Sequence, residues 1–128
     1  MNNVNPFSEF TVVVPIFNKK DYIKRCLFSI SKASNGEYLE VILVDDGSTD
    51  NWEEVLKENS FLNLEIKVIK QSNQGVSSAR NTGLKNCSTK YCCFLDADDE
   101  WTGQGPAELQ AVRLRRRSGS LCTDLRSQ

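Results

Sequence analysis

The sequence contains no histidine. This absence removes the side chain that most often serves as a general base near neutral pH, and it removes the commonest zinc ligand. Any metal ion here must therefore be held by oxygen atoms, which favours Mg²⁺ or Mn²⁺.

Long apolar runs are also missing from the chain. No stretch approaches the roughly 20 residues that span a bilayer, so we expect no transmembrane segment. Residues 1–6 lack the basic region and apolar core of a secretory signal. We therefore expect a cytoplasmic protein, with peripheral binding to the inner face of the membrane as the alternative.

The chain has no large excess of either charge. It has 128 residues, a formal net charge of −1, 39% hydrophobic residues and 26% charged residues. These values are typical of one soluble globular domain with a modest core. They argue against a general nucleic-acid or membrane-surface binder.

Five cysteines are present, an odd number, and no pair has metal-ligand spacing: Cys26, Cys87, Cys92, Cys93 and Cys122. We interpret them as buried free thiols. Cys92 and Cys93 are neighbours in an apolar segment, so we expect them to point to opposite faces of a strand.

Apolar, β-branched segments at four places have the character of buried strands, namely 11–16, 40–44, 64–69 and 91–95. Pro15 cannot donate a ladder hydrogen bond, so it should lie near a strand end.

Helical patterns fill the three intervals between these strands. We expect the first helix to be capped by Asn18 and ended by Asn35-Gly36. Asp50 with Glu53 fits a capping pair for a second helix, and Gly75 opens a third.

This alternation predicts an α/β fold with a mostly parallel sheet of about four strands and helices on both faces. Ligands of such sheets bind beyond the carboxyl ends of the strands. Three polar clusters fall there, at residues 15–18, 45–48 and 96–99.

The third cluster, Asp96-Ala97-Asp98-Asp99, follows a buried strand directly. Its carboxylates repel one another and are costly to desolvate. A divalent cation that carries a phosphorylated ligand is the most natural counter-charge. The alternative is an acidic turn on the surface.

The composition changes after Trp101. Nine lysines and two arginines precede this point, whereas five arginines and no lysine follow it. Our hypothesis is that residues 102–128 derive from a shifted frame or foreign sequence and are mostly disordered. The alternative is a basic tail that touches an anionic lipid or nucleic acid. We interpret Trp101 itself as a packing anchor rather than a sugar platform.

Taken together, four motifs strongly resemble family 2 glycosyltransferases over about residues 9–101: Val13 to Asn18, Val44 to Asp50, Asn73 to Gly83 and Phe94 to Asp99. The resemblance implies a Rossmann-like GT-A half-domain that binds a nucleotide-diphosphate sugar, with a UDP-sugar favoured. It also implies that Pro15 and Phe17 line the base site, that Asp46 bonds the base, and that Arg80 lies near the nucleotide.

The same resemblance identifies Asp96 and Asp98 as a DxD element. It implies that Asp98 binds Mg²⁺ or Mn²⁺ and that Asp96 contacts the ribose or a metal-bound water, with Asp99 as a candidate to assist either. The acceptor-side general base of the family lies well beyond this element. Glu108 and Asp124 are the only acidic residues after Trp101, and neither lies in a matching motif. The catalytic base therefore stays unknown.

We accordingly divide the chain into an extension at 1–8, a nucleotide-sugar-binding region at 9–101 and the atypical tail at 102–128. The resemblance implies transfer of a sugar to a glycan or lipid-linked acceptor in bacterial surface polysaccharide synthesis, with no nucleic-acid partner. One alternative is a truncated, non-catalytic fragment that only binds the donor. A remote alternative is a receiver-type signalling domain, although the first strand ends without the expected carboxylates.

Overall fold

The computed structural model describes residues 7–101 and 112–113. Within them the chain forms one sheet, whose strands are ordered β3-β2-β1-β4-β5. The strands are β1 (Phe10–Ile16), β2 (Leu39–Asp45), β3 (Leu64–Lys70), β4 (Tyr91–Phe94) and β5 (Val112–Arg113). The first four run parallel, and β5 pairs antiparallel with β4.

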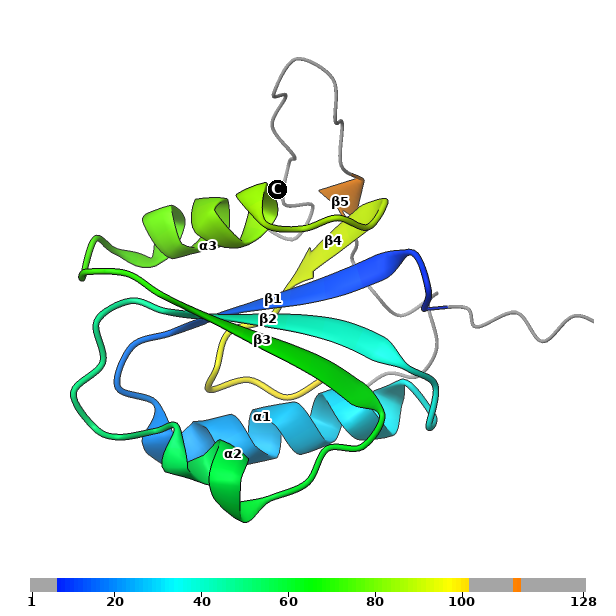
Figure 1. Cartoon of the computed structure of the whole chain (residues 1–128), viewed down its shortest axis with the longest axis horizontal. Helices are drawn as coiled ribbons and strands as arrows, with labels where there is room; N and C mark the ends of the chain where they lie inside the picture. The colour runs from blue at the N-terminus through cyan, green and yellow to red at the C-terminus, as the bar shows by residue number, and fades with distance from the viewer. Residues whose placement is uncertain (1–6, 102–111, 114–128) are drawn as a thin grey trace, which may run out of the picture.

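Helices cover both faces of this sheet. They are α1 (Lys20–Ala33), α2 (Glu54–Glu58) and α3 (Val76–Lys85). Figure 1 shows α1 and α2 on one face and α3 on the other. The predicted α/β architecture, with about four parallel strands and helices on both faces, is confirmed.

Strand residues alternate between two apolar layers. On the face of α1 and α2, Val12, Val14 and Ile16 pack with Ile23 and Leu27, while on the α3 face Val13, Ile42 and Val44 pack with Ala79. Burial of each such side chain contributes about 1.5–3 kcal/mol. Cys93 joins the first layer and Cys92 the second, so the predicted opposite facing is confirmed.

The ends of α1 and α2 differ from the expected capping. The cap position of α1 is Lys19, which makes no side-chain capping bond, and the expected cap Asn18 lies one residue earlier. Asp50 serves α1 instead, because its Oδ2 accepts a hydrogen bond from the Lys20 N–H at 2.8 Å. The cap position of α2 is Glu53, again without a side-chain bond. Both capping predictions were therefore wrong.

The predicted end of α1 at Asn35-Gly36 is confirmed. The helix stops at Ala33, and Asn35 and Gly36 follow with φ of 57° and 83°. These left-handed conformations are those that asparagine and glycine tolerate best.

Trp101 is partly buried, and its ring packs edge-on against Phe7 at a centroid distance of 6.0 Å. The predicted packing role is confirmed. Cys26, Cys87, Cys92 and Cys93 are buried thiols that form no disulfide within the described residues, as predicted. Cys122 lies outside the described residues. Of the predicted tail the structure describes only Val112–Arg113, so the interpretation of residues 102–128 stays a prediction. Among the described helices, none is long and apolar enough to cross a bilayer.

Candidate functional site

A cleft of about 570 Å³ opens at the carboxyl ends of the parallel strands. It receives residues from the segments that follow β1, β2 and β4 and from the start of α3. Six residues singled out from the sequence line it together: Pro15, Phe17, Asp46, Arg80, Asp96 and Asp98. The polar clusters thus meet at one edge of the sheet, as the parallel topology requires.

Asp46 fastens the loop before α3 to the end of β2. Its Oδ1 accepts hydrogen bonds from Gln71 Nε2 at 2.9 Å and from the Gln74 N–H at 2.8 Å. Its Oδ2 accepts a third from the Gly75 N–H at 2.9 Å. The side chain is therefore both a wall of the cleft and the anchor that places the start of α3.

The pKa of Asp46 reflects two opposed effects. Burial of the carboxyl raises its pKa, since the charged form loses water. The hydrogen bonds from Gln71, Gln74 and Gly75 favour the charged form and together outweigh burial. The net pKa lies below the ordinary value of 3.8, so Asp46 is a carboxylate near neutral pH.

The turn after Asp46 is held by close backbone contacts. Gly47 has φ of +86°, and a β-carbon there would lie 2.9 Å from the Asn73 nitrogen. Asn73 Nδ2 in turn donates to the Asp46 carbonyl at 3.1 Å. A side chain at position 47 would therefore push apart the two loops that form this wall of the cleft.

Apolar side chains that line the cleft are left exposed. Phe17 is 45% exposed and Val76 is 51% exposed, and both line the cleft with Pro15. Exposed apolar surface inside a cleft that also holds polar groups is typical of a ligand site. These walls suit a flat, partly apolar ring.

Arg80 of α3 lines the cleft and pairs with Asp96 of the third cluster. Its Nη2 donates to Asp96 Oδ1 at 3.3 Å, and its guanidinium lies 5.9 Å from the Phe94 ring centroid. Its Nε is buried and has no hydrogen-bond partner within the described part of the chain. A buried polar group without a partner is uncommon, so the packing around Arg80 leaves one hydrogen bond unmade at this Nε.

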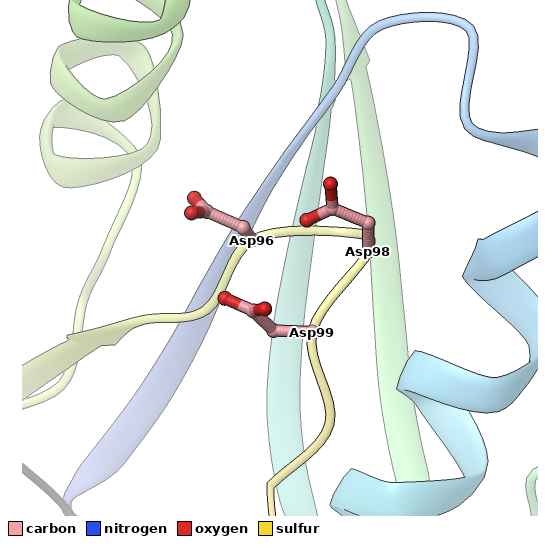
Figure 2. Close-up of side chains that lie close together, drawn as sticks. All are labelled: Asp96, Asp98 and Asp99. Atoms are coloured by element: carbon pink, nitrogen blue, oxygen red, sulfur yellow. The ribbon is translucent and has the colours of Figure 1, made fainter.

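Three carboxylates of the Asp96 to Asp99 loop gather within metal-binding distance. Asp96, Asp98 and Asp99 each offer an oxygen atom, and these atoms all lie within 4.8 Å of one another. Figure 2 shows the three side chains leaving one short loop beyond β4. The Asp99 N–H donates to the Asp96 carbonyl at 2.9 Å, which closes the turn. An all-oxygen donor set with room for added ligands fits Mg²⁺ or Mn²⁺.

The thiol of Cys26 donates a hydrogen bond to this loop. Its Sγ donates to the Asp96 carbonyl at 3.7 Å. Burial raises the pKa of Cys26 to about 12, and the nearby carboxylates of Asp99, Asp96 and Asp98 add to the shift. The thiol thus stays protonated and acts as a donor to the loop.

Two cations, one at the cap position of α1 and one within α1, pair with the same loop. Lys19 Nζ lies 3.3 Å from Asp98 Oδ2. Arg25 Nε lies 3.0 Å from Glu100 Oε2, and its guanidinium reaches the Asp98 carbonyl at 3.5 Å. These contacts offset part of the repulsion among the carboxylates of the loop.

Sequence reasoning missed Lys19 and Val76, which both line the cleft. Val76 is the first residue of α3, where its side chain is exposed to the cleft rather than packed in the core. One sequence feature could have pointed to Lys19. It is a basic residue at the start of a predicted helix, where acidic or hydroxyl side chains are preferred. Asp99 belongs to the carboxylate cluster but does not line the cleft, and Asn81 is exposed on α3.

Comparison with known proteins places these features in context. The sequence model described as Glycosyl transferase family 2 matches residues 11–112. "Glycosyltransferase GlyA" of Streptococcus pneumoniae serotype 4 is 43% identical over 100 residues, which are 78% of this chain and 14% of that protein. "Minor teichoic acid biosynthesis protein GgaA" of Bacillus subtilis is 40% identical over 100 residues, covering 73% of this chain and 22% of that protein.

Solved structures show the same arrangement of the backbone. S. aureus TarS 1-349 in complex with UDP superposes with a TM-score of 0.62 at 33% identity, over 75% of this chain and 29% of that chain. The mannosyltransferase PcManGT from Pyrobaculum calidifontis, in complex with GDP-Man and Mn²⁺, gives a TM-score of 0.62 at 26% identity, over 75% and 29%. The chain therefore spans less than a third of the length of each of these relatives.

Proposed function

Since this chain belongs to glycosyl transferase family 2, we propose that its cleft binds a nucleotide-diphosphate sugar as the donor of a sugar transfer. One observation carries the proposal. A single cleft joins exposed apolar walls, a buried carboxylate and two of the three acidic side chains that cluster after β4. The apolar walls suit the ring of a nucleotide base, and the buried carboxylate suits the polar edge of that base. The acidic side chains suit a metal ion that binds the diphosphate.

The apolar end of the cleft is proposed to take the base. Pro15, Phe17 and Val76 offer surfaces on which a flat ring packs. Asp46 already accepts three hydrogen bonds, and a carboxylate has about four acceptor positions. One position therefore remains for a base N–H, as uracil offers. The UDP complex of TarS supports this choice of base.

The acidic end is proposed to hold the cation. Asp98, with Asp96 and Asp99, would bind Mg²⁺ or Mn²⁺, and the Mn²⁺ complex of PcManGT supports this cofactor class. Such an ion stabilises the negative charge that develops on the departing nucleoside diphosphate. Arg80 is proposed to fix the Asp96 carboxylate and to lie near the nucleotide.

The acceptor side is proposed from the relatives alone. GgaA carries a name in teichoic acid biosynthesis, which supports a glycan or lipid-linked acceptor of the cell surface. An attacking hydroxyl needs a carboxylate that removes its proton. The cleft carboxylates have other roles in this proposal, so none is assigned as the base. A chain that binds the donor without transferring it is the second candidate, since no described carboxylate is assigned as the base.

A panel of UDP-, GDP- and TDP-sugars with Mn²⁺ tests the proposal. We expect saturable binding of one donor class, lost on EDTA addition, and at least about tenfold weaker binding by Asp98→Asn because a metal ligand is removed. Asp21→Asn, which removes an exposed charge from the first turn of α1, serves as the control. Release of a nucleoside diphosphate with sugar transfer identifies a transferase, and binding without turnover identifies the donor-binding candidate. No binding to any donor would reject both.

A further inference from the structure

Lys19 lines the cleft beside the acidic loop, although no sequence motif nominates it. Its Nζ lies 3.3 Å from Asp98 Oδ2, and its side chain is 37% exposed. The pair is therefore open to solvent and to any ligand that enters the cleft. An exposed pair of this kind is weak and exchangeable.

Position 19 is an unfavourable place for lysine by local rules. It is the cap of α1, where serine, threonine, aspartate and asparagine are preferred. A positive charge at a helix N-terminus also opposes the helix dipole. Asp50, from a different loop, supplies the missing acceptor to the Lys20 N–H. The stability of α1 therefore does not explain the lysine, and a local rule broken at a cleft points to function.

The Lys19 ammonium group lies near an aromatic ring and a second cation. The Tyr22 ring centroid lies 5.7 Å from Lys19 Nζ and 5.8 Å from the Arg25 guanidinium. Arg25 is itself tied to Glu100. Lys19 and Arg25 thus place two cations beside the acidic loop, and of these two Lys19 lines the cleft.

We propose that Lys19 neutralises Asp98 before a divalent cation binds, yields that carboxylate to the cation, and then binds the diphosphate of the donor. This inference rests on the proposed function and adds a residue to it. A divalent cation bound by Asp96, Asp98 and Asp99 would repel the Lys19 ammonium group, because both would contact the Asp98 carboxylate. The displaced ammonium group would then bind the anionic diphosphate.

Lys19→Gln, compared with Lys24→Gln, tests this role. Lys24 is exposed on α1, so its change removes the same charge without touching the cleft. Titration of Mn²⁺ alone, followed by electron paramagnetic resonance, should show affinity raised by up to about fivefold in Lys19→Gln, since a weak competitor is lost. Titration of UDP at saturating Mn²⁺ should show affinity lowered about tenfold, since a charge-assisted bond is lost. Lys24→Gln should match the unsubstituted chain in both.

The paired titrations separate failure of this inference from failure of the proposed function. If the unsubstituted chain binds UDP with Mn²⁺ and Lys19→Gln behaves the same in both titrations, Lys19 has no such role. Weaker binding of Mn²⁺ alone by Lys19→Gln would overturn the inference that Lys19 competes with the cation for Asp98. An unsubstituted chain that binds neither ligand contradicts the donor site itself. Far-UV circular dichroism of each variant checks that the fold is kept.

Discussion

Asp46 and Asp98 occupy the same cleft but have opposite environments. Asp46 is buried and accepts three hydrogen bonds from the chain. Asp98 is exposed and pairs only with the flexible ammonium of Lys19 through its carboxylate, within the described residues. A carboxylate that accepts three hydrogen bonds from the chain stabilises its loop, whereas a loosely paired one is free to exchange partners. We therefore expect substitutions at the two positions to affect different properties.

Asp46→Asn should lower the free energy of unfolding by about 1–3 kcal/mol at pH 7, because an amide nitrogen would face the Gly75 N–H and leave it unpaired. The folded pKa of Asp46 lies below its unfolded value of about 3.8. Its stabilisation is thus present above that pH and is lost as the pH falls toward the folded pKa.

Urea unfolding at pH 7 and at pH 3 measures both effects. The difference between the unsubstituted chain and Asp46→Asn should shrink at pH 3. Asp21→Asn, at an exposed position in the first turn of α1, should lose less than about 1 kcal/mol at pH 7. An Asp46→Asn variant as stable as the unsubstituted chain at pH 7 would show that the three bonds do not hold the loop.

The types of residue at the strand ends were predictable, but their partners were not. Pro15, Phe17, Asp46, Arg80, Asp96 and Asp98 were chosen from motifs, and all of them line the cleft. The sequence did not indicate that Asp46 bonds the Gln71 to Gly75 loop, because those contacts span 25 or more residues. Their roles toward a nucleotide or a metal stay predictions until a ligand is bound.

At the scale of elements, the packing of α3 against the sheet depends on Gly83, which has no side chain. A β-carbon at Gly83 would overlap Cγ1 of Val13 on β1. The helix can therefore approach the sheet more closely there than any other residue would allow. That approach helps to place Arg80, one turn earlier on α3, over the cleft.

Gly83→Ala should destabilise the fold by about 1–3 kcal/mol through overpacking, although alanine is the better helix former. Chemical denaturation of Gly83→Ala, Val13→Ala and the double variant measures the coupling. Because Val13→Ala makes room for the new β-carbon, the double variant should be more stable than the sum of the single losses predicts. Additive losses would rule out the contact. Lys85→Ala, at an exposed position of the same helix, should change little.

The cap of α1 comes from a loop that lies 30 residues away in the chain. Asp50→Ala should therefore cost about 1 kcal/mol, the usual loss for a missing cap. Asp50→Asn keeps an acceptor oxygen and should cost less. Amide hydrogen exchange at Lys20 and Asp21 should accelerate in Asp50→Ala while exchange at the end of α1 stays slow. Unchanged exchange at the start of α1 would show that the cap is dispensable.

Local capping rules failed here for a physical reason. Asp50 precedes a short helix in sequence and so was assigned to it, but its carboxylate turns to α1. Asn18 adopts φ of 52° and bonds the Thr49 N–H through its Oδ1. Both side chains join the loops after β1 and β2. Such cross-loop bonds need the folded sheet, and sequence spacing alone does not reveal them.

At the scale of the whole molecule, topology brings the site together. Parallel pairing of β1 with β2 and β4 sends three loops to one edge of the sheet. The alternation of strand and helix predicted this, because right-handed parallel crossovers leave few other arrangements. The antiparallel pairing of β5 with β4 was not predicted, since it lies in a region without a clear apolar period. The likeness to TarS extends over 75% of this chain.

Thermal melting with UDP and Mn²⁺, separately and together, tests the central claim most directly. A ligand that binds only the folded state raises the melting temperature. If the cleft holds a metal-bound nucleoside diphosphate, the melting temperature should rise clearly only when both ligands are present, and the rise should be lost in Asp98→Asn. An equal rise with UDP alone, or the same combined rise in Asp98→Asn, would contradict the assigned site.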